Sequence, residues 1–78
     1  MGTLNTKQEI LMSRLQVGDK SEIVTNPYTG AKVTLEPKAV ALYDFIKGCE
    51  AMGSYKSFDE ARYIFMELWP EEYMQLLD

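Results

Sequence analysis

Residues 22–35 have the sequence EIVTNPYTGAKVTL, and this stretch decides the fold class. Two runs of β-favouring residues, 22–25 and 31–35, flank a segment from Asn26 to Gly30. In this segment the asparagine starts a turn, the proline presets φ at the next position, and the glycine can take a positive φ where the second run begins. The stretch therefore predicts a β-hairpin with a five-residue turn.

The segment before the hairpin predicts one helix, over residues 6–17. Thr6 and Glu9 have the spacing of a capping box, in which each side chain bonds a free backbone N–H at the helix start. Apolar residues follow at helical spacing, and Gly18 can adopt the left-handed conformation that ends a helix.

The segment after the hairpin predicts three helices, over residues 37–52, 58–69 and 70–77. Pro37 and Pro70 each suit a first helical turn, where the N–H that proline lacks would be unpaired. The helices, the hairpin and the absence of a linker or repeat predict a single α+β domain.

Two further local predictions concern the helices after the hairpin. Ser57 and Glu60 have capping-box spacing, so we expect Ser57 to cap the helix over 58–69. Cys49 falls on the apolar face of the helix over 37–52, so we expect a buried structural thiol.

Composition excludes several kinds of site. The chain has 78 residues, no histidine and one cysteine, so it lacks the commonest metal ligand and cannot form a disulfide within itself. It has no glycine-rich phosphate loop and no calcium-binding spacing. The paired acidic residues lie at predicted helix starts, where they complement the helix dipole. We therefore expect no catalytic residue, metal or cofactor, and a protein that is not an enzyme.

Charge is distributed unevenly along the chain. The formal net charge is −4, of which residues 1–39 carry +1 and residues 40–78 carry −5. The acidic half could occupy a basic surface on a partner, such as a host protein, or could be a solvated face only. Lys20, Lys32 and Lys38 around the hairpin provide the alternative hypothesis of nucleic-acid binding, although acidic residues interleave with them.

The aromatic and methionine residues of the C-terminal half suggest an interface. A chain of this size buries only about 63% of its surface on folding, so it can hide few large side chains. Tyr, Trp and Met are also enriched in interface cores. We therefore expect a homo-oligomer, with a partner interface formed by Tyr63, Met66, Trp69, Tyr73 and Met74. The alternative is that the last helix folds back and covers Trp69 and Tyr73 within one chain.

Residues 22–78 resemble small uncharacterised proteins encoded by bacteriophages. The resemblance rests on NPYTG at 26–30, LEPKAVALYDFIKG at 35–48 and FMELWPEEYM at 65–74. It implies a small accessory protein made in a bacterial cytoplasm, and it carries over no functional residue. No apolar run approaches the roughly 20 residues of a membrane span, and the start of the chain lacks the apolar region of a signal peptide. We therefore expect a cytoplasmic protein that does not span a membrane.

Overall fold

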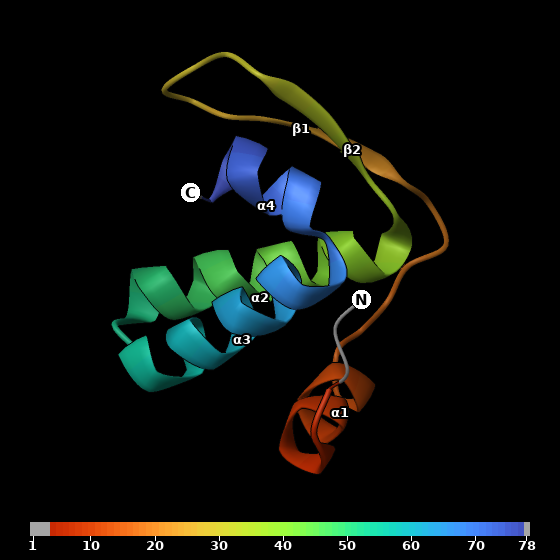
Figure 1. Ribbon diagram of the computed structural model, residues 1–78, viewed down its shortest axis with the longest axis vertical. Coiled ribbons are helices and arrows are strands. Elements are labelled where there is room, and N and C mark those ends of the chain that lie inside the picture. The colour runs from red at the N-terminus through yellow and green to blue at the C-terminus, as the bar shows by residue number, and fades with distance from the viewer. Residues whose placement is uncertain (1–3, 78) are drawn as a thin grey trace.

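A computed structural model describes residues 4–77 and has the predicted α+β class (Figure 1). The elements in chain order are α1 (Thr6–Ser13), β1 (Glu22–Thr25), β2 (Lys32–Leu35), α2 (Pro37–Met52), α3 (Tyr55–Leu68) and α4 (Pro70–Leu76).

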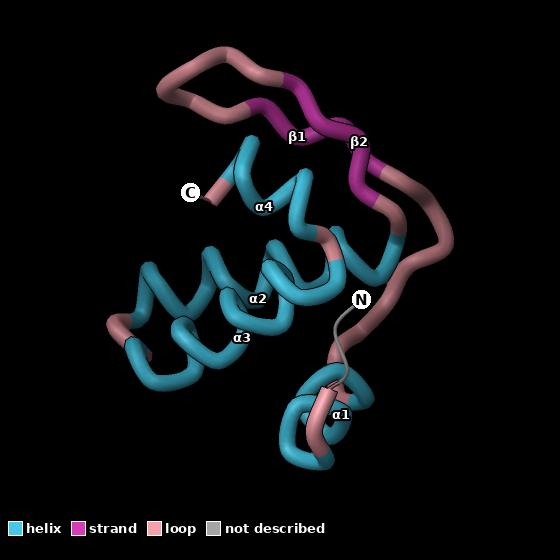
Figure 2. Tube along the Cα trace, in the orientation of Figure 1, coloured by secondary structure: helices cyan, strands magenta, loops and turns pink. Residues whose placement is uncertain are grey.

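Three helices and the hairpin form the body of the protein. α2 and α3 are joined by only two residues and lie side by side (Figure 1). α4 packs on α3 and against β2, so it lies between the helical pair and the hairpin (Figure 2). α1 is set apart from this body and contacts α3. The N-terminal helix is thus the most peripheral of the described elements.

The hairpin has the predicted strands and turn. β1 and β2 are antiparallel, and Val24 pairs with Val33 in a register that also joins Glu22 to Leu35. Gly30 has φ +78°, the left-handed conformation that the sequence assigned to it. Leu35 is 1% exposed, whereas Ile23 is 69% exposed. The hairpin therefore has one face on the core and one face in solvent.

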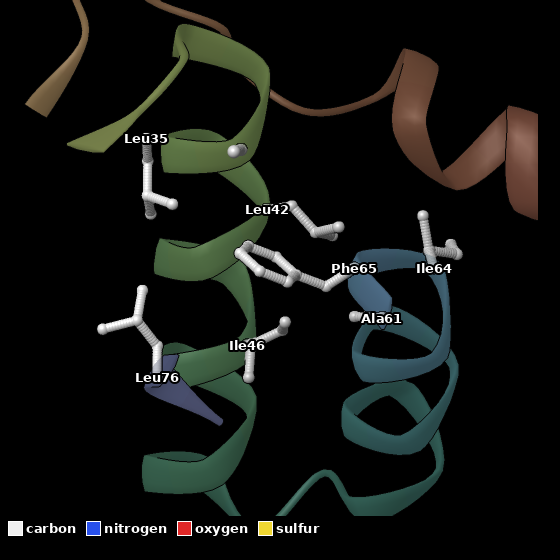
Figure 3. Packing of buried hydrophobic residues seen from close by; sticks show 8 residues of the cluster. Leu35, Leu42, Ile46, Ala61, Ile64, Phe65 and Leu76 are labelled. Atoms are coloured by element: carbon white, nitrogen blue, oxygen red, sulfur yellow. The ribbon is translucent and has the colours of Figure 1, made fainter. Parts of the chain in front are cut away.

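The hydrophobic core lies where α2, α3, α4 and β2 meet (Figure 3). Phe65 is its largest fully buried side chain and packs among leucine, isoleucine and alanine side chains. The cluster consists of Leu35, Ala39, Leu42, Ile46, Ala61, Ile64, Phe65 and Leu76. Cys49 is 7% exposed and has a free thiol, which confirms the prediction that this side chain is buried.

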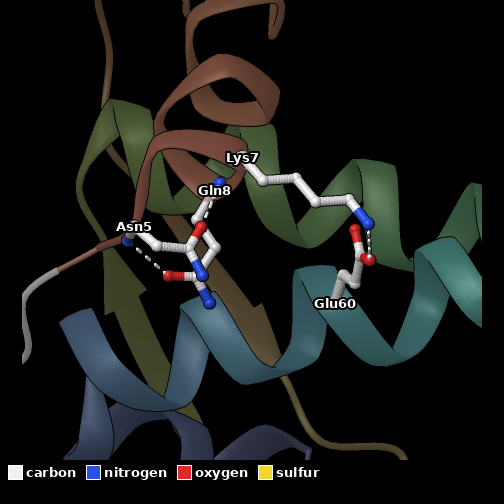
Figure 4. Close-up of polar contacts among 4 residues, drawn as sticks. All are labelled: Asn5, Lys7, Gln8 and Glu60. Atoms are coloured by element: carbon white, nitrogen blue, oxygen red, sulfur yellow. Dashed lines mark hydrogen bonds and ion pairs between the residues drawn. The ribbon is translucent and has the colours of Figure 1, made fainter.

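The prediction for α1 was wrong in its cap and its end. Asn5 caps the helix instead of Thr6: the Gln8 N–H donates to Asn5 Oδ1 at 2.9 Å, and the Asn5 N–H donates to Gln8 Oε1 at 2.9 Å (Figure 4). The helix ends at Ser13 and not at residue 17. Its last turn tightens into i to i+3 bonds, and the Ser13 hydroxyl donates to the Ile10 carbonyl at 2.7 Å. These bonds stop the helix before Gly18.

The predicted start of the third helix was also wrong. α3 begins at Tyr55 and ends at Leu68, so Ser57 lies inside its first turn and caps nothing. The physical reason is the preceding turn: Gly53 has φ +75°, and the Ser54 N–H donates to the Cys49 carbonyl at 2.9 Å. This closes the end of α2 within two residues and lets α3 start three residues earlier than predicted. α4 starts at Pro70 as predicted and ends at Leu76, one residue early.

Candidate functional site

The candidate site is the C-terminal surface, defined as Tyr63, Met66, Trp69, Tyr73 and Met74. Tyr63 is 51% exposed, Met66 37% and Met74 68%. Tyr63 and Met66 are exposed because they lie on the side of α3 opposite the buried Ile64 and Phe65. The surface is therefore open to a partner at Tyr63 and Met66 on α3 and at Met74 on α4.

A hollow of about 270 Å³ lies in the C-terminal surface, where α3 meets α4. It is lined by Asp59, Arg62, Tyr63 and Met66 of α3 and by Tyr73 of α4. The four α3 residues have the 3- and 4-residue spacing of a single helix face. The structure thus brings together three of the five predicted interface residues and adds a basic and an acidic side chain that the prediction did not include.

Trp69 and Tyr73 are less available than the other three residues. Both are partly buried and pack against the core, and the centre of the Trp69 ring lies 5.3 Å from the centre of the Phe65 ring. Trp69 does not line the hollow. The packing of α4 therefore buries these two rings only in part, and it leaves Tyr63, Met66 and Met74 exposed.

Arg62 is the positive group of the hollow. Its guanidinium Cζ lies 5.7 Å from the centre of the Phe58 ring, a cation–π distance that orients the side chain along α3. Asp59 and Arg62 are both exposed, and neither forms an ion pair within residues 4–77. Charges of both signs therefore lie beside exposed apolar side chains.

The three lysines of the alternative hypothesis do not line one hollow. Lys20 lines a groove between the segment before β1 and α2, where Asp19, Glu22 and Asp44 are also present. Lys38 lines a different hollow, next to α1, and Lys32 is exposed on β2. Within the described residues, the groove at Lys20 has more acidic than basic side chains, which is unfavourable for phosphate.

The same groove contains the acidic residues Asp19, Glu22 and Asp44. Its three acidic residues are solvent-exposed, and nothing buries one of them against another. Within residues 4–77, no group of His, Cys, Asp or Glu side chains is arranged to hold a metal ion. None of the three carboxylates in this groove therefore has the buried, closely paired environment that is typical of a catalytic acid or base.

Asn26 forms the predicted turn and also makes a long-range contact that the sequence did not reveal. Its Oδ1 accepts from the N–H groups of Tyr28 at 2.8 Å and Thr29 at 3.3 Å, and its Nδ2 donates to the Gln75 carbonyl at 2.8 Å. The side chain therefore forms the turn and also ties the hairpin to the last carbonyls of α4. Such a bond spans 49 residues, so no local pattern predicts it.

Comparison with known proteins gives no family for the chain: neither protein-family models, nor curated proteins, nor solved structures contain a match. Within residues 4–77, no helix has both the length and the apolar character needed to cross a lipid bilayer.

Proposed function

We propose that this protein is a non-enzymatic interaction module that self-associates through its C-terminal surface. The observation that carries the proposal is the hollow on α3, where Tyr63, Met66 and Tyr73 lie together beside Asp59 and Arg62. Exposed tyrosine, methionine and arginine side chains around a shallow hollow are typical of the central part of a protein interface.

The amount of exposed surface supports a second copy. The chain exposes 5508 Å², about 700 Å² more than the roughly 4,800 Å² that area scaling gives for a monomer of 8.9 kDa. A standard interface covers about 800 Å² on each partner. The excess is comparable with the area of one such contact, and the set-apart helix α1 also contributes to it.

The charges of the surface also suit a second copy. A two-fold interface places the same residues of both copies opposite each other, so a surface of one sign would repel itself. The hollow contains Arg62 and Asp59, and the Arg62 of one copy can pair with the Asp59 of the other. The apolar side chains of Tyr63 and Met66 then meet between these charged pairs.

A sedimentation-velocity series over micromolar to millimolar concentrations tests the proposal. We expect the wild type to change from monomer to dimer across the series, and Tyr63→Ala/Met66→Ala to require at least about tenfold more protein for the same change. Each truncated side chain at the centre of an interface typically costs about 1–2 kcal/mol, so the double variant weakens association by at least tenfold.

The matched control replaces residues of the same types outside the surface. Tyr55 is 71% exposed and Met52 82%, and both lie at the turn between α2 and α3. Tyr55→Ala/Met52→Ala should associate like the wild type. A wild type that stays monomeric throughout, or an equal loss in both double variants, would contradict the proposal.

The proposal includes a cellular context. The resemblance to small phage-encoded proteins supports a role in the cytoplasm of a bacterial host. The acidic groups on α4, Glu71 and Glu72, lie next to the C-terminal surface and favour a host partner with a basic surface as the ligand of the assembled dimer.

A further inference from the structure

Within residues 4–77, the backbone groups at the outer edge of β1 have no hydrogen-bond partner. The hairpin is a sheet of only two strands, so each strand has one free edge. The Asn26 N–H donates to the Ala31 carbonyl across the hairpin at 2.8 Å, and hydrogen-bonded rungs alternate in antiparallel pairs. Val24 and Val33 then form a bonded rung. Ile23 and Thr25 point their N–H and C=O groups away from β2.

The edge of β1 is more accessible than the edge of β2. β2 packs against α2 and α4 and leads directly into α2 at Pro37. β1, by contrast, has its main contacts with β2. β1 follows an exposed connection over residues 16–21. It also contains neither of the two residues, lysine and proline, that commonly protect an edge strand from pairing.

We propose that the outer edge of β1 pairs with β1 of a second copy, antiparallel about Val24, so that the two hairpins form one continuous sheet. In this register Ile23 of each copy faces Thr25 of the other, and each of these rungs exchanges N–H···O bonds in both directions. The edge of β1 is separate from the C-terminal surface on α3 and α4. Pairing at this edge does not depend on association through the C-terminal surface.

The side chains of β1 suit pairing with themselves. Ile23, 69% exposed, meets Thr25 of the other copy, and β-branched residues directly opposite each other stabilise a sheet. Glu22 faces Asn26 of the other copy, so no like charges are opposed. The same register brings the segment around Lys20 toward Tyr28, which is 94% exposed on the turn of the other copy. An exposed aromatic ring is a favourable neighbour for an ammonium group.

Amide hydrogen exchange at increasing protein concentration tests the proposal residue by residue. The protein is Tyr63→Ala/Met66→Ala, so that association through α3 is weakened. We expect exchange at Ile23 and Thr25 to slow by at least about tenfold between micromolar and millimolar protein, while Val24, bonded inside the hairpin, keeps its rate. Rates at Ile23 and Thr25 that do not change with concentration overturn the proposal.

Two proline substitutions on one rung provide the matched control. Ile23 pairs with Thr34, and the N–H groups of both residues point outward, at opposite edges. Proline is tolerated at such positions because its missing N–H makes no bond within the sheet. Ile23→Pro should abolish the concentration-dependent protection of Thr25, and Thr34→Pro should preserve it.

Loss of protection with Thr34→Pro and not with Ile23→Pro would place the contact on β2 and overturn the proposal. If amide exchange at Ile23 and Thr25 slowed only after an unrelated extended peptide was added, the edge would bind a different chain, and the proposal that a second copy binds there would be wrong.

Discussion

Removing the side chain of Asn26 is expected to separate the hairpin from α4. Asn26 is 8% exposed and makes three hydrogen bonds, two that hold the turn and one to the Gln75 carbonyl. That carbonyl lies in the last turn of α4, where backbone acceptors have no partner within the helix. Asn26→Ala removes all three bonds.

The magnitude follows from burial. A hydrogen bond contributes about 0.5–1.5 kcal/mol, and a buried group left unpaired costs about 1–3 kcal/mol. We expect Asn26→Ala to lower the free energy of unfolding by about 2–4 kcal/mol. Thr29→Ala is the control in the same turn: its hydroxyl accepts only from the exposed Ala31 N–H, at 3.2 Å, so the expected loss is below about 1 kcal/mol.

Asn26→Asp separates the two roles of the side chain. The carboxylate keeps the acceptor for the turn but loses the donor to Gln75 and places a negative charge beside a carbonyl oxygen. We expect burial and this contact to outweigh the Tyr28 and Thr29 N–H donors, which favour the charged form, and to raise the pKa of the introduced carboxyl above its unfolded value of about 3.9. The penalty relative to the wild type is therefore present above the folded-state pKa and disappears as the pH falls below about 3.9, where the protonated group can donate.

Urea denaturation followed by the fluorescence of Trp69, the only tryptophan, measures all of these variants. We expect the Asn26→Asp deficit to shrink as the pH is lowered from neutral toward 4, while the Asn26→Ala deficit stays constant. Equal losses in Asn26→Ala and Thr29→Ala, or an Asn26→Asp deficit that does not depend on pH, would refute the assignment of Asn26 as the tether.

Three further variants test individual elements of the fold. Gly53→Ala should cost about 1–2 kcal/mol in urea denaturation, because φ at this position is +75°; a neutral result would show that the turn between α2 and α3 is not left-handed. Asn5→Ala should destabilise α1 by about 1 kcal/mol, seen as faster amide exchange in α1, whereas Ser57→Ala should change the denaturation midpoint little. A larger loss of stability with Ser57→Ala than with Asn5→Ala would show that Ser57 does cap α3. Phe65→Ala should cost about 3–5 kcal/mol and abolish cooperative unfolding, and retained cooperativity would mean that Phe65 is not central to the core.

Sequence was sufficient where the structural signal is local. Residues from Asn26 to Gly30 specify the hairpin turn by themselves, and Pro37 marks the start of α2. The start of α3 was missed because it depends on how the chain closes after α2, through the bond from Ser54 to the Cys49 carbonyl.

The cap of α1 shows a second reason for error. Two frames of the sequence, Asn5 with Gln8 and Thr6 with Glu9, have the same capping-box spacing of three residues. Spacing alone cannot choose between them. In the structure Asn5 takes the cap, and Lys7 is placed to form an ion pair with Glu60 of α3 at 2.8 Å (Figure 4).

The candidate site was partly accessible from periodicity. Tyr63 and Met66 fall opposite the apolar face of α3, so their exposure follows from helical spacing. The contribution of Tyr73 to the same hollow depends on how α4 packs on α3, which is a tertiary feature. The half-burial of Trp69 against Phe65 has the same origin.

Intermolecular contacts at the C-terminal surface test its role most directly. An equimolar mixture of protein labelled at the methionine methyl groups and unlabelled protein, at millimolar concentration, permits isotope-filtered NMR of contacts between copies only. We expect cross-peaks from the methyl group of Met66 to the rings of Tyr63 and Tyr73 of the other copy, whose side chains line the hollow together. Association without these cross-peaks, or no association at this concentration, would contradict self-association through this surface.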